Sequence, residues 1–226
     1  MYDHSSEIKL SFDTGSLGDN VSSAHGHSDI FHFTLQQGEK QLIIDPGTYQ
    51  YHQKESFWRN YFRSITAHNT ISINNRNHAI MNNRMSWIDR PKKPKTQFLY
   101  NETETTCEGI HNAFSKENVI HKRTISFDKK IKKVLIKDTL TSNSDATKDV
   151  FYYLHFKPSI EVSLKGNEIY ISRKNKNILI KNETFANKAV FFEGNEEIPI
   201  GWFSRSYNEK EKCKSLVLKL LSLIHI

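Results

Sequence analysis

The chain has 226 residues, a hydrophobic content of 37% and a formal net charge of +7 at pH 7. This size and composition are those of a globular protein with one large domain or two small ones. No run of about 18 apolar residues occurs, which excludes a transmembrane helix, and residues 1–20 lack the apolar core of a signal peptide.

The basic charge suits a polyanionic partner. An acidic polysaccharide and a nucleic acid would both satisfy it, and so would lysines on solvated strand faces, such as those in residues 129–133. No nucleic-acid-binding module is recognisable, and aromatic residues do not alternate with arginines, so we expect no nucleic-acid partner. Cys107 and Cys213 fit no metal or redox motif and are expected to be packing residues.

The N-terminal part of the chain predicts a strand followed by a hairpin. Residues 8–13 read as a strand, and the alternating apolar residues of 27–36 predict a second one. Gln37-Gly38 predicts a two-residue turn, and residues 39–45 then return along the second strand. Such a hairpin would bring Asp45, at its end, close to the start of the second strand.

Histidines and a carboxylate gather around this hairpin. His25 and His27 lie two residues apart, so in an extended segment both would project to the same side, one toward a metal and the other toward substrate. Asp45 is followed by a Pro-Gly turn, and His68 precedes a strand predicted over residues 70–74. Two imidazoles and one carboxylate are a common zinc set with a fourth position left open. His32 falls in the other register and is expected to be structural or exposed.

The connection between Pro46 and Ala67 is long and rich in aromatic residues, which favours a functional loop over disorder. Arg59 and Arg63 are four residues apart and would share one face of a helical turn over residues 56–64.

These arginines are expected to bind a sugar carboxylate or sulfate, although ion pairs with Asp45 or Glu55 are an alternative. Tyr49 could reach substrate or serve packing. Asn69, next to His68, could bind substrate or orient a metal ligand.

The remainder of the chain predicts an antiparallel β-sandwich, because short strands recur with Gly or Asn turns between them. A last or penultimate strand is expected over residues 200–207. We expect one domain over residues 1–220; residues 221–226 resemble a translated sequencing adapter and are expected to be artefactual. The predicted strands beyond residue 95 are 119–127, 131–140, 150–156, 161–164, 168–172, 178–180 and 189–192.

Three segments together resemble the heparinase II/III-like polysaccharide lyases: His25–Asp29, Ile43–His52 and Trp58–Asn74. In that family this block opens a β-sandwich that follows an N-terminal α/α toroid, for which this chain has no matching region. By motif position, His25 resembles the catalytic histidine, and His27, Asp45 and His68 resemble zinc ligands. The family's catalytic tyrosine and its carboxylate-neutralising Asn or His lie in the toroid, so we expect a fragment that is inactive alone.

The resemblance implies β-elimination on a uronic-acid-containing polysaccharide, with a zinc ion whose role we expect to be structural, and a periplasmic or secreted location. Two other functions stay open. A cupin-like metalloenzyme shares the H-x-H pattern, but Phe31 or His32 occupies the position where a cupin needs glutamate. A non-catalytic carbohydrate-binding sandwich would share the fold. The sequence does not identify the oligomeric state.

Overall fold

The structure is a computed structural model that describes residues 1–3, 7–19, 21, 24–52, 56–172, 178–181 and 186–220. The tail expected at residues 221–226 lies outside the described residues. Within the described part, no helix is long and apolar enough to cross a membrane.

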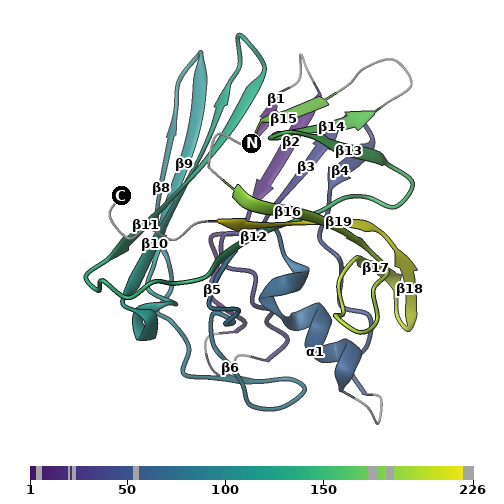
Figure 1. Cartoon of the computed structure of the whole chain (residues 1–226). Coiled ribbons are helices and arrows are strands. Elements are labelled where there is room, and N and C mark those ends of the chain that lie inside the picture. Colours follow the sequence, from purple (N-terminus) through teal and green to yellow (C-terminus); the bar gives the residue numbers. More distant parts are fainter. Residues whose placement is uncertain are drawn as a thin grey trace.

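Most of the described elements are strands (Figure 1). In chain order they are β1 (Tyr2–Asp3), β2 (Ile8–Phe12), β3 (Phe33–Gln37), β4 (Lys40–Ile43), helix α1 (Phe57–Arg63), the 3-10 helix η1 (Ile65–Ala67), β5 (Ile71–Ile73), β6 (Ile80–Met81), β7 (Trp87–Ile88), β8 (Lys95–Tyr100), β9 (Glu104–His111), the 3-10 helix η2 (Ser115–Glu117), β10 (Val119–Asp128), β11 (Lys133–Ser142), β12 (Val150–His155), β13 (Glu161–Lys165), β14 (Glu168–Ser172), β15 (Ile178–Lys181), β16 (Ala186–Glu193), β17 (Trp202–Ser206), β18 (Glu209–Lys212) and β19 (Lys214–Leu220).

The predicted all-β antiparallel sandwich is confirmed. Three four-stranded sheets have the orders β1-β2-β3-β4, β11-β10-β9-β8 and β16-β19-β12-β5, and β13-β14-β15 form a smaller sheet. Strand pairing is antiparallel throughout the described ladders. An isolated bridge between Ile43 and Phe156 joins the first sheet to the chain just after β12.

The main core fills the space between these sheets because each contributes one apolar face to it. On β10, for example, alternate residues are buried, as a strand with one face on the core requires. The buried members of this core come from all four sheets: Leu10, Phe33, Leu42, Ile43, Ile125, Leu154, Phe156, Val162, Ile169, Ile171, Leu216 and Leu218.

The predicted hairpin exists, but its turn is displaced by one residue. Gln37 pairs with Lys40, so the turn residues are Gly38 and Glu39 rather than Gln37 and Gly38. The reason is conformational: Gly38 has φ of 57°, a value that glycine adopts without strain. Asp45 consequently lies beyond the end of the ladder and not opposite residue 29 or 30.

The strand predicted over residues 27–36 is too long, because β3 begins only at Phe33. The chain turns before this point: His32 donates its backbone N–H to the carbonyl of Asp29 at 2.8 Å, and Phe31 has φ of 64°. His25 also has a positive φ, of 62°, so the prediction that the chain is extended from His25 to His27 is wrong. Side-chain alternation therefore does not decide where these residues point.

The connection between Pro46 and Ala67 is held by helix α1 and η1, in agreement with the helical turn predicted over residues 56–64. Figure 1 shows α1 on the side of the β12–β19 strands opposite β13 to β15. The strand predicted over residues 200–207 is neither last nor penultimate, because β18 and β19 follow it. Since β19 lies between β16 and β12, the end of the described chain completes a central part of the fold.

Candidate active site and metal centre

Helix α1 holds the segment that carries His25 and His27. Arg63, near the end of α1, directs its guanidinium to three backbone carbonyls: Asn83 at 2.7 Å, Ser86 at 3.2 Å and Gly26 at 3.4 Å. Trp87 donates its indole N–H to the same Gly26 carbonyl at 2.7 Å, and the Arg63 guanidinium lies over the Trp87 ring. The residue between the two histidines is thus fixed by two side chains.

Arg59 lies one turn earlier on the same face of α1 and is equally buried, with 1% of its surface exposed. Its Nη1 lies 3.2 Å from Nε2 of His27, and its guanidinium stacks over the Tyr51 ring at 4.6 Å. Its Nη2 is buried without a hydrogen-bond partner in the described structure. Among the described residues Asp45 pairs with His32 and His68 and not with Arg59 or Arg63, so the alternative pairing with Asp45 is not observed; Glu55, the other partner considered, lies outside the described residues.

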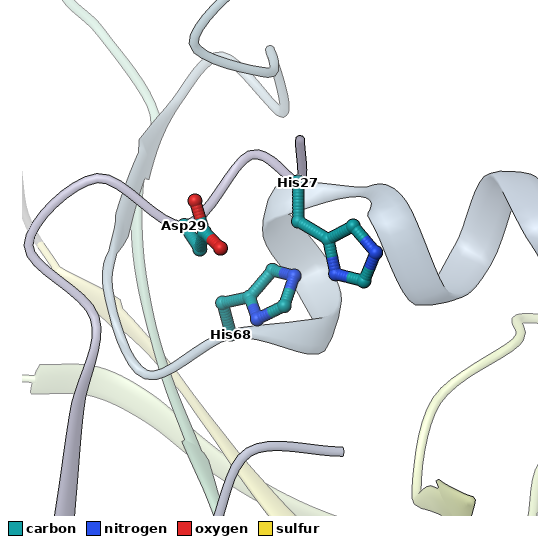
Figure 2. A group of neighbouring side chains, drawn as sticks. All are labelled: His27, Asp29 and His68. Carbon is teal, nitrogen blue, oxygen red and sulfur yellow. The ribbon is translucent and has the colours of Figure 1, made fainter. Parts of the chain in front are cut away.

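His68 is the centre of a cluster of possible metal ligands. Its ligand atom lies within 4.8 Å of those of His27 and Asp29, and likewise within 4.8 Å of those of His32 and Asp45. Figure 2 shows the side chains of His27, Asp29 and His68 turned toward one another. Although His68 is fully buried, neither of its ring nitrogens has a hydrogen-bond partner among the described residues. A buried imidazole with two unsatisfied nitrogens is a donor group that a metal would satisfy.

The second carboxylate of this cluster, Asp45, is placed by the turn that follows it. Its Oδ1 accepts the N–H of Gly47 at 2.7 Å, and its Oδ2 lies 3.4 Å from both His32 Nε2 and His68 Nδ1. Gly47 has φ of 90°, and a Cβ there would lie 2.3 Å from the carbonyl oxygen of Ser204. Only glycine fits this position, which explains why Pro-Gly follows the aspartate.

The hydrogen bonds of His32 determine which of its nitrogens carries the proton. Its Nδ1 accepts the backbone N–H of Asn69 at 2.8 Å, so the neutral ring bears its proton on Nε2, facing Asp45. This tautomer leaves no free lone pair for a metal. His32 is therefore suited to orienting Asp45. The predicted ligands His27, Asp45 and His68 do not form one group with ligand atoms within 4.8 Å of one another: His68 belongs to both observed groups, His27 to the group with Asp29, and Asp45 to the group with His32.

His27 carries a similar constraint. An arginine can only donate, so Nε2 of His27 accepts from Arg59 and the proton of the neutral ring lies on Nδ1. A metal would need the lone pair of one nitrogen and leave the proton on the other. A metal on Nε2 would displace the N–H of Arg59, and a metal on Nδ1 would leave the proton on Nε2, where it could not accept from Arg59. Metal binding at His27 would therefore leave Nη1 of Arg59 without this partner, and Nη2 of the same guanidinium already has none among the described residues.

Electrostatics favours neutral imidazoles and a charged carboxylate in this cluster. Burial lowers the pKa of His27 to about 3 and that of His32 to about 4. Removal from solvent acts to raise the pKa of Asp45, but His68, His32 and the Gly47 N–H hold it well below its usual range. Neutral imidazole and ionised carboxylate are the forms that bind metal.

The other two titratable groups of the cluster behave differently. Burial raises the pKa of Asp29 to about 7, against the opposing effect of His68. Burial acts to lower the pKa of His68, but the carboxylates of Asp45, Asp29 and Asp13 outweigh it and raise the pKa. Three carboxylates therefore lie near the His68 imidazole and favour its protonated form.

His25, two residues before His27, is exposed. Its ring meets the ring of Tyr51 at a centroid distance of 5.4 Å, and Tyr51 in turn carries the Arg59 guanidinium. The predicted tyrosine, Tyr49, instead stacks on Phe62 at 5.5 Å and meets Trp58 at 6.4 Å, so it packs against α1. The tyrosine in contact with His25 is therefore Tyr51.

Asn69 is fully buried, and its carboxamide is used within the fold. Its Nδ2 donates to the carbonyls of Phe33 at 2.7 Å and Ile44 at 2.9 Å, and its Oδ1 accepts the N–H of His155 at 2.8 Å. These bonds join β3 and the end of β4 to β12. No donor of this side chain is left for substrate, which supports the other role considered for it, that of orienting its neighbours.

Two residues of the site were missed from the sequence, Asp29 and Tyr51, whereas His32, expected to be structural or exposed, is buried beside Asp45. The positive φ values at residues 25 and 31 break the alternation on which the sequence reasoning relied. The only available signal was proximity, since Asp29 lies two residues after His27 and Tyr51 two residues after Tyr49.

Comparison with known proteins agrees with this fold. Among solved structures, the chain is similar to a mutant of the heparan sulfate lyase HepC from Pedobacter heparinus, with a TM-score of 0.74 and 18% identity over 95% of this chain and 30% of that one. It is also similar to a crystal structure described as heparinase III, with a TM-score of 0.73 and 18% identity over 96% of this chain and 31% of that one. The chain thus spans about 30% of the length of the HepC structure.

No curated protein sequence matches the chain significantly. A family model does match almost all of it, over residues 3–221, and its description is "Heparinase II/III-like, C-terminal". The chain therefore belongs to the heparinase II/III-like C-terminal domain family.

Proposed function

We propose that this chain is the β-sandwich domain of a polysaccharide lyase that cleaves a uronic-acid-containing polysaccharide by β-elimination. The observation that carries the proposal is the series of contacts that links the exposed imidazole of His25, through the Tyr51 ring and the Arg59 guanidinium, to His27. Family membership and the similarity to a heparan sulfate lyase support the same reading.

In a β-elimination of this type a base removes the proton at C5 of the uronic acid, and the glycosidic oxygen at C4 leaves. We propose that His25 takes or returns this proton, a role that suits a solvent-accessible imidazole. Tyr51, whose ring contacts His25, would help to hold it in place, whereas Tyr49 would serve the packing of α1. The negative charge that develops on the substrate carboxylate needs hydrogen-bond donors or a cation.

We propose Arg59 as a donor of this kind. Its guanidinium is cationic and contacts the ring that also touches His25, and its Nη2 has no partner among the described residues. Arg63 does not offer the same possibility because its donors are directed to backbone carbonyls. Of the two arginines expected to bind substrate, we therefore retain Arg59 and assign Arg63 a positioning role.

We also propose a zinc ion held by His27, Asp45 and His68, of which His68 belongs to both groups of neighbouring ligand atoms, His27 to one group and Asp45 to the other. The unsatisfied nitrogens of buried His68 and the low pKa values of the neighbouring groups support this assignment. When bound, zinc would supply a cross-link between the loop of His27, the end of the hairpin and the loop of His68. This role is structural, because the free energy of zinc binding would stabilise the folded chain relative to the unfolded chain, which has no preformed site.

The proposal is tested by His25→Ala in an enzyme that carries this domain together with the α/α toroid expected for the family. Unsaturated product, detected by its ultraviolet absorbance, should fall to background while binding of the acidic polysaccharide persists. His52→Ala is the matched control, since His52 is also exposed and follows Tyr51. Full activity of the His25→Ala enzyme would refute the catalytic role. Absence of product from the unmodified enzyme with binding retained would indicate a carbohydrate-binding sandwich. The domain alone should form no product.

A further inference from the structure

Arg123 is a fully buried arginine in the middle of β10. It belongs to the sheet β11-β10-β9-β8, none of whose residues was predicted to take part in the site. Burying a guanidinium in a core is costly unless its charge is paired and its N–H groups are hydrogen-bonded. The groups that satisfy Arg123 therefore indicate what it does.

Two of its N–H groups reach the backbone of the site. Nη1 of Arg123 donates to the carbonyl of Phe31 at 2.6 Å and to the carbonyl of Asn69 at 2.9 Å. Phe31 directly precedes His32, and Asn69 directly follows His68. One nitrogen atom thus joins the segment of Asp29 and His32, which lie beside the proposed metal centre, to the segment of His68, which is one of its proposed ligands, although the two segments are far apart in the sequence.

The same two segments are joined a second time by the backbone N–H of Asn69, which His32 Nδ1 accepts. Phe31 is held in a conformation unfavourable for a bulky residue, with φ of 64°. Its ring fills the space above Gly109, where a Cβ would lie 2.4 Å from the ring. Such a conformation persists only where its surroundings enforce it, and the bond from Arg123 is part of that enforcement.

The remaining donors of Arg123 bind Asp138 on β11. Nε lies 2.6 Å from Oδ1 and Nη2 lies 2.9 Å from Oδ2, the two-point geometry that arginine forms with a carboxylate. Asp138 Oδ1 also lies 2.7 Å from Nε2 of His121, and Nδ1 of His121 lies 2.9 Å from Nε2 of His111. Since His111 Nδ1 accepts the N–H of Ala113, each ring donates its Nε2 proton to the next group, and Asp138 accepts at both oxygens.

We propose that Arg123, held by Asp138, is a positioning residue for the metal centre. It fixes the separation between the 29–32 segment and the 68–69 segment, and through this separation it determines the affinity for a divalent metal. The expected effect on zinc affinity rests on the proposed metal centre, but the link that Arg123 forms between the two segments, through its bonds to Phe31 and Asn69, can be tested without metal.

The test is the substitution Arg123→Lys. A lysine keeps the positive charge, but one ammonium group cannot bind both carboxylate oxygens and both carbonyls. Arg76→Lys is the matched control, because the Arg76 side chain is 55% exposed and pairs with Glu117 away from the site. Both variants and the unmodified chain are measured for zinc affinity by competition with a chromophoric chelator, and for hydrogen exchange of backbone amides without metal.

For Arg123→Lys we expect zinc affinity to fall at least tenfold and the Asn69 amide, which is bonded to His32, to exchange at least tenfold faster. The amides that pair β13 with β14, strands to which Arg123 makes no hydrogen bond, should exchange at an unchanged rate, which a general loss of stability would not allow. The 15N shifts of the His32 ring should also show loss of the acceptor state at Nδ1. Arg76→Lys should match the unmodified chain.

Unchanged exchange of the Asn69 amide in folded Arg123→Lys would overturn the inference. If the unmodified chain binds no zinc, the proposed metal centre is refuted, but the exchange measurement still tests whether Arg123 links the two segments. If Arg123→Lys does not fold, Asp138→Asn provides the same comparison, since it leaves the guanidinium in place and removes the charge that orients it. The same pattern is expected for it, with a smaller loss of affinity.

Discussion

Replacement of Asn69 by alanine separates a positioning role from substrate binding. The side chain makes three buried hydrogen bonds, to the carbonyls of Phe33 and Ile44 and from the N–H of His155. Alanine leaves all three backbone groups without this partner in a site that is closed to water. Leaving a buried polar group unsatisfied costs about 1–3 kcal/mol, so for three such groups we expect a loss of roughly 3–9 kcal/mol in the free energy of unfolding.

A loss of that size is a large part of the total stability of a domain, which is typically about 5–15 kcal/mol. The measurement is urea denaturation of the Asn69→Ala chain beside the unmodified chain. Asn60→Ala is the matched control, because Asn60 is exposed on α1 and should change the free energy of unfolding by less than about 0.5 kcal/mol. The reasoning is refuted if Asn69→Ala costs less than about 1 kcal/mol and instead raises KM for the polysaccharide in the full enzyme.

Three further predictions concern charged groups near the site. Arg59→Met should raise zinc affinity about tenfold, because it removes a hydrogen bond of about 1.5 kcal/mol to the His27 nitrogen that a metal would need. The same substitution should raise KM for the anionic substrate. Unchanged zinc affinity in chelator competition and unchanged KM would contradict this prediction. Arg63→Lys should lower the free energy of unfolding by about 2–4 kcal/mol, because hydrogen bonds to three backbone carbonyls are lost. The kcat and KM of the folded enzyme should be unchanged. A variant of normal stability with a raised KM would instead indicate that Arg63 contacts the substrate. Burial lowers the pKa of His155 to about 3, so between about pH 6.5 and pH 3 only the unfolded chain binds a proton at this residue. The free energy of unfolding therefore decreases as the pH falls through that window, by about 1.4 kcal/mol per pH unit. His155→Gln should weaken this pH dependence in urea denaturation, and an identical dependence in the variant would refute the prediction.

The strand pattern could be predicted because alternation within a strand reflects which face is buried. The residues of β10 and β12 are recognisable in this way, and the observed boundaries differ from the predicted ones by a residue or two. Arg59 and Arg63 could be placed on one helical face for the same local reason, since a period near 3.6 is a property of the backbone. What each arginine binds was not predictable, because Gly26, Asn83 and Tyr51 come from other segments.

Local chemistry also indicated His27, Asp45 and His68 as a group with metal-binding residue types, and it indicated that Asp45 ends a hairpin. The sequence by itself therefore determined the fold class, the helical turn and the residue types of the site. Only the tertiary structure decided that His32 faces Asp45 and that Asp29 faces His68, because positive φ values at His25 and Phe31 reverse the chain there.

The hydrogen-bond partners of Asn69 and Arg123 were likewise decided by the tertiary structure. Both residues act through hydrogen bonds to carbonyls that lie tens of residues away in the chain, and such partners leave no periodic pattern in a sequence. Local propensity and periodicity report the backbone and the buried face of each element. The distances between elements, on which a metal centre and a catalytic site depend, arise only when the sheets pack together.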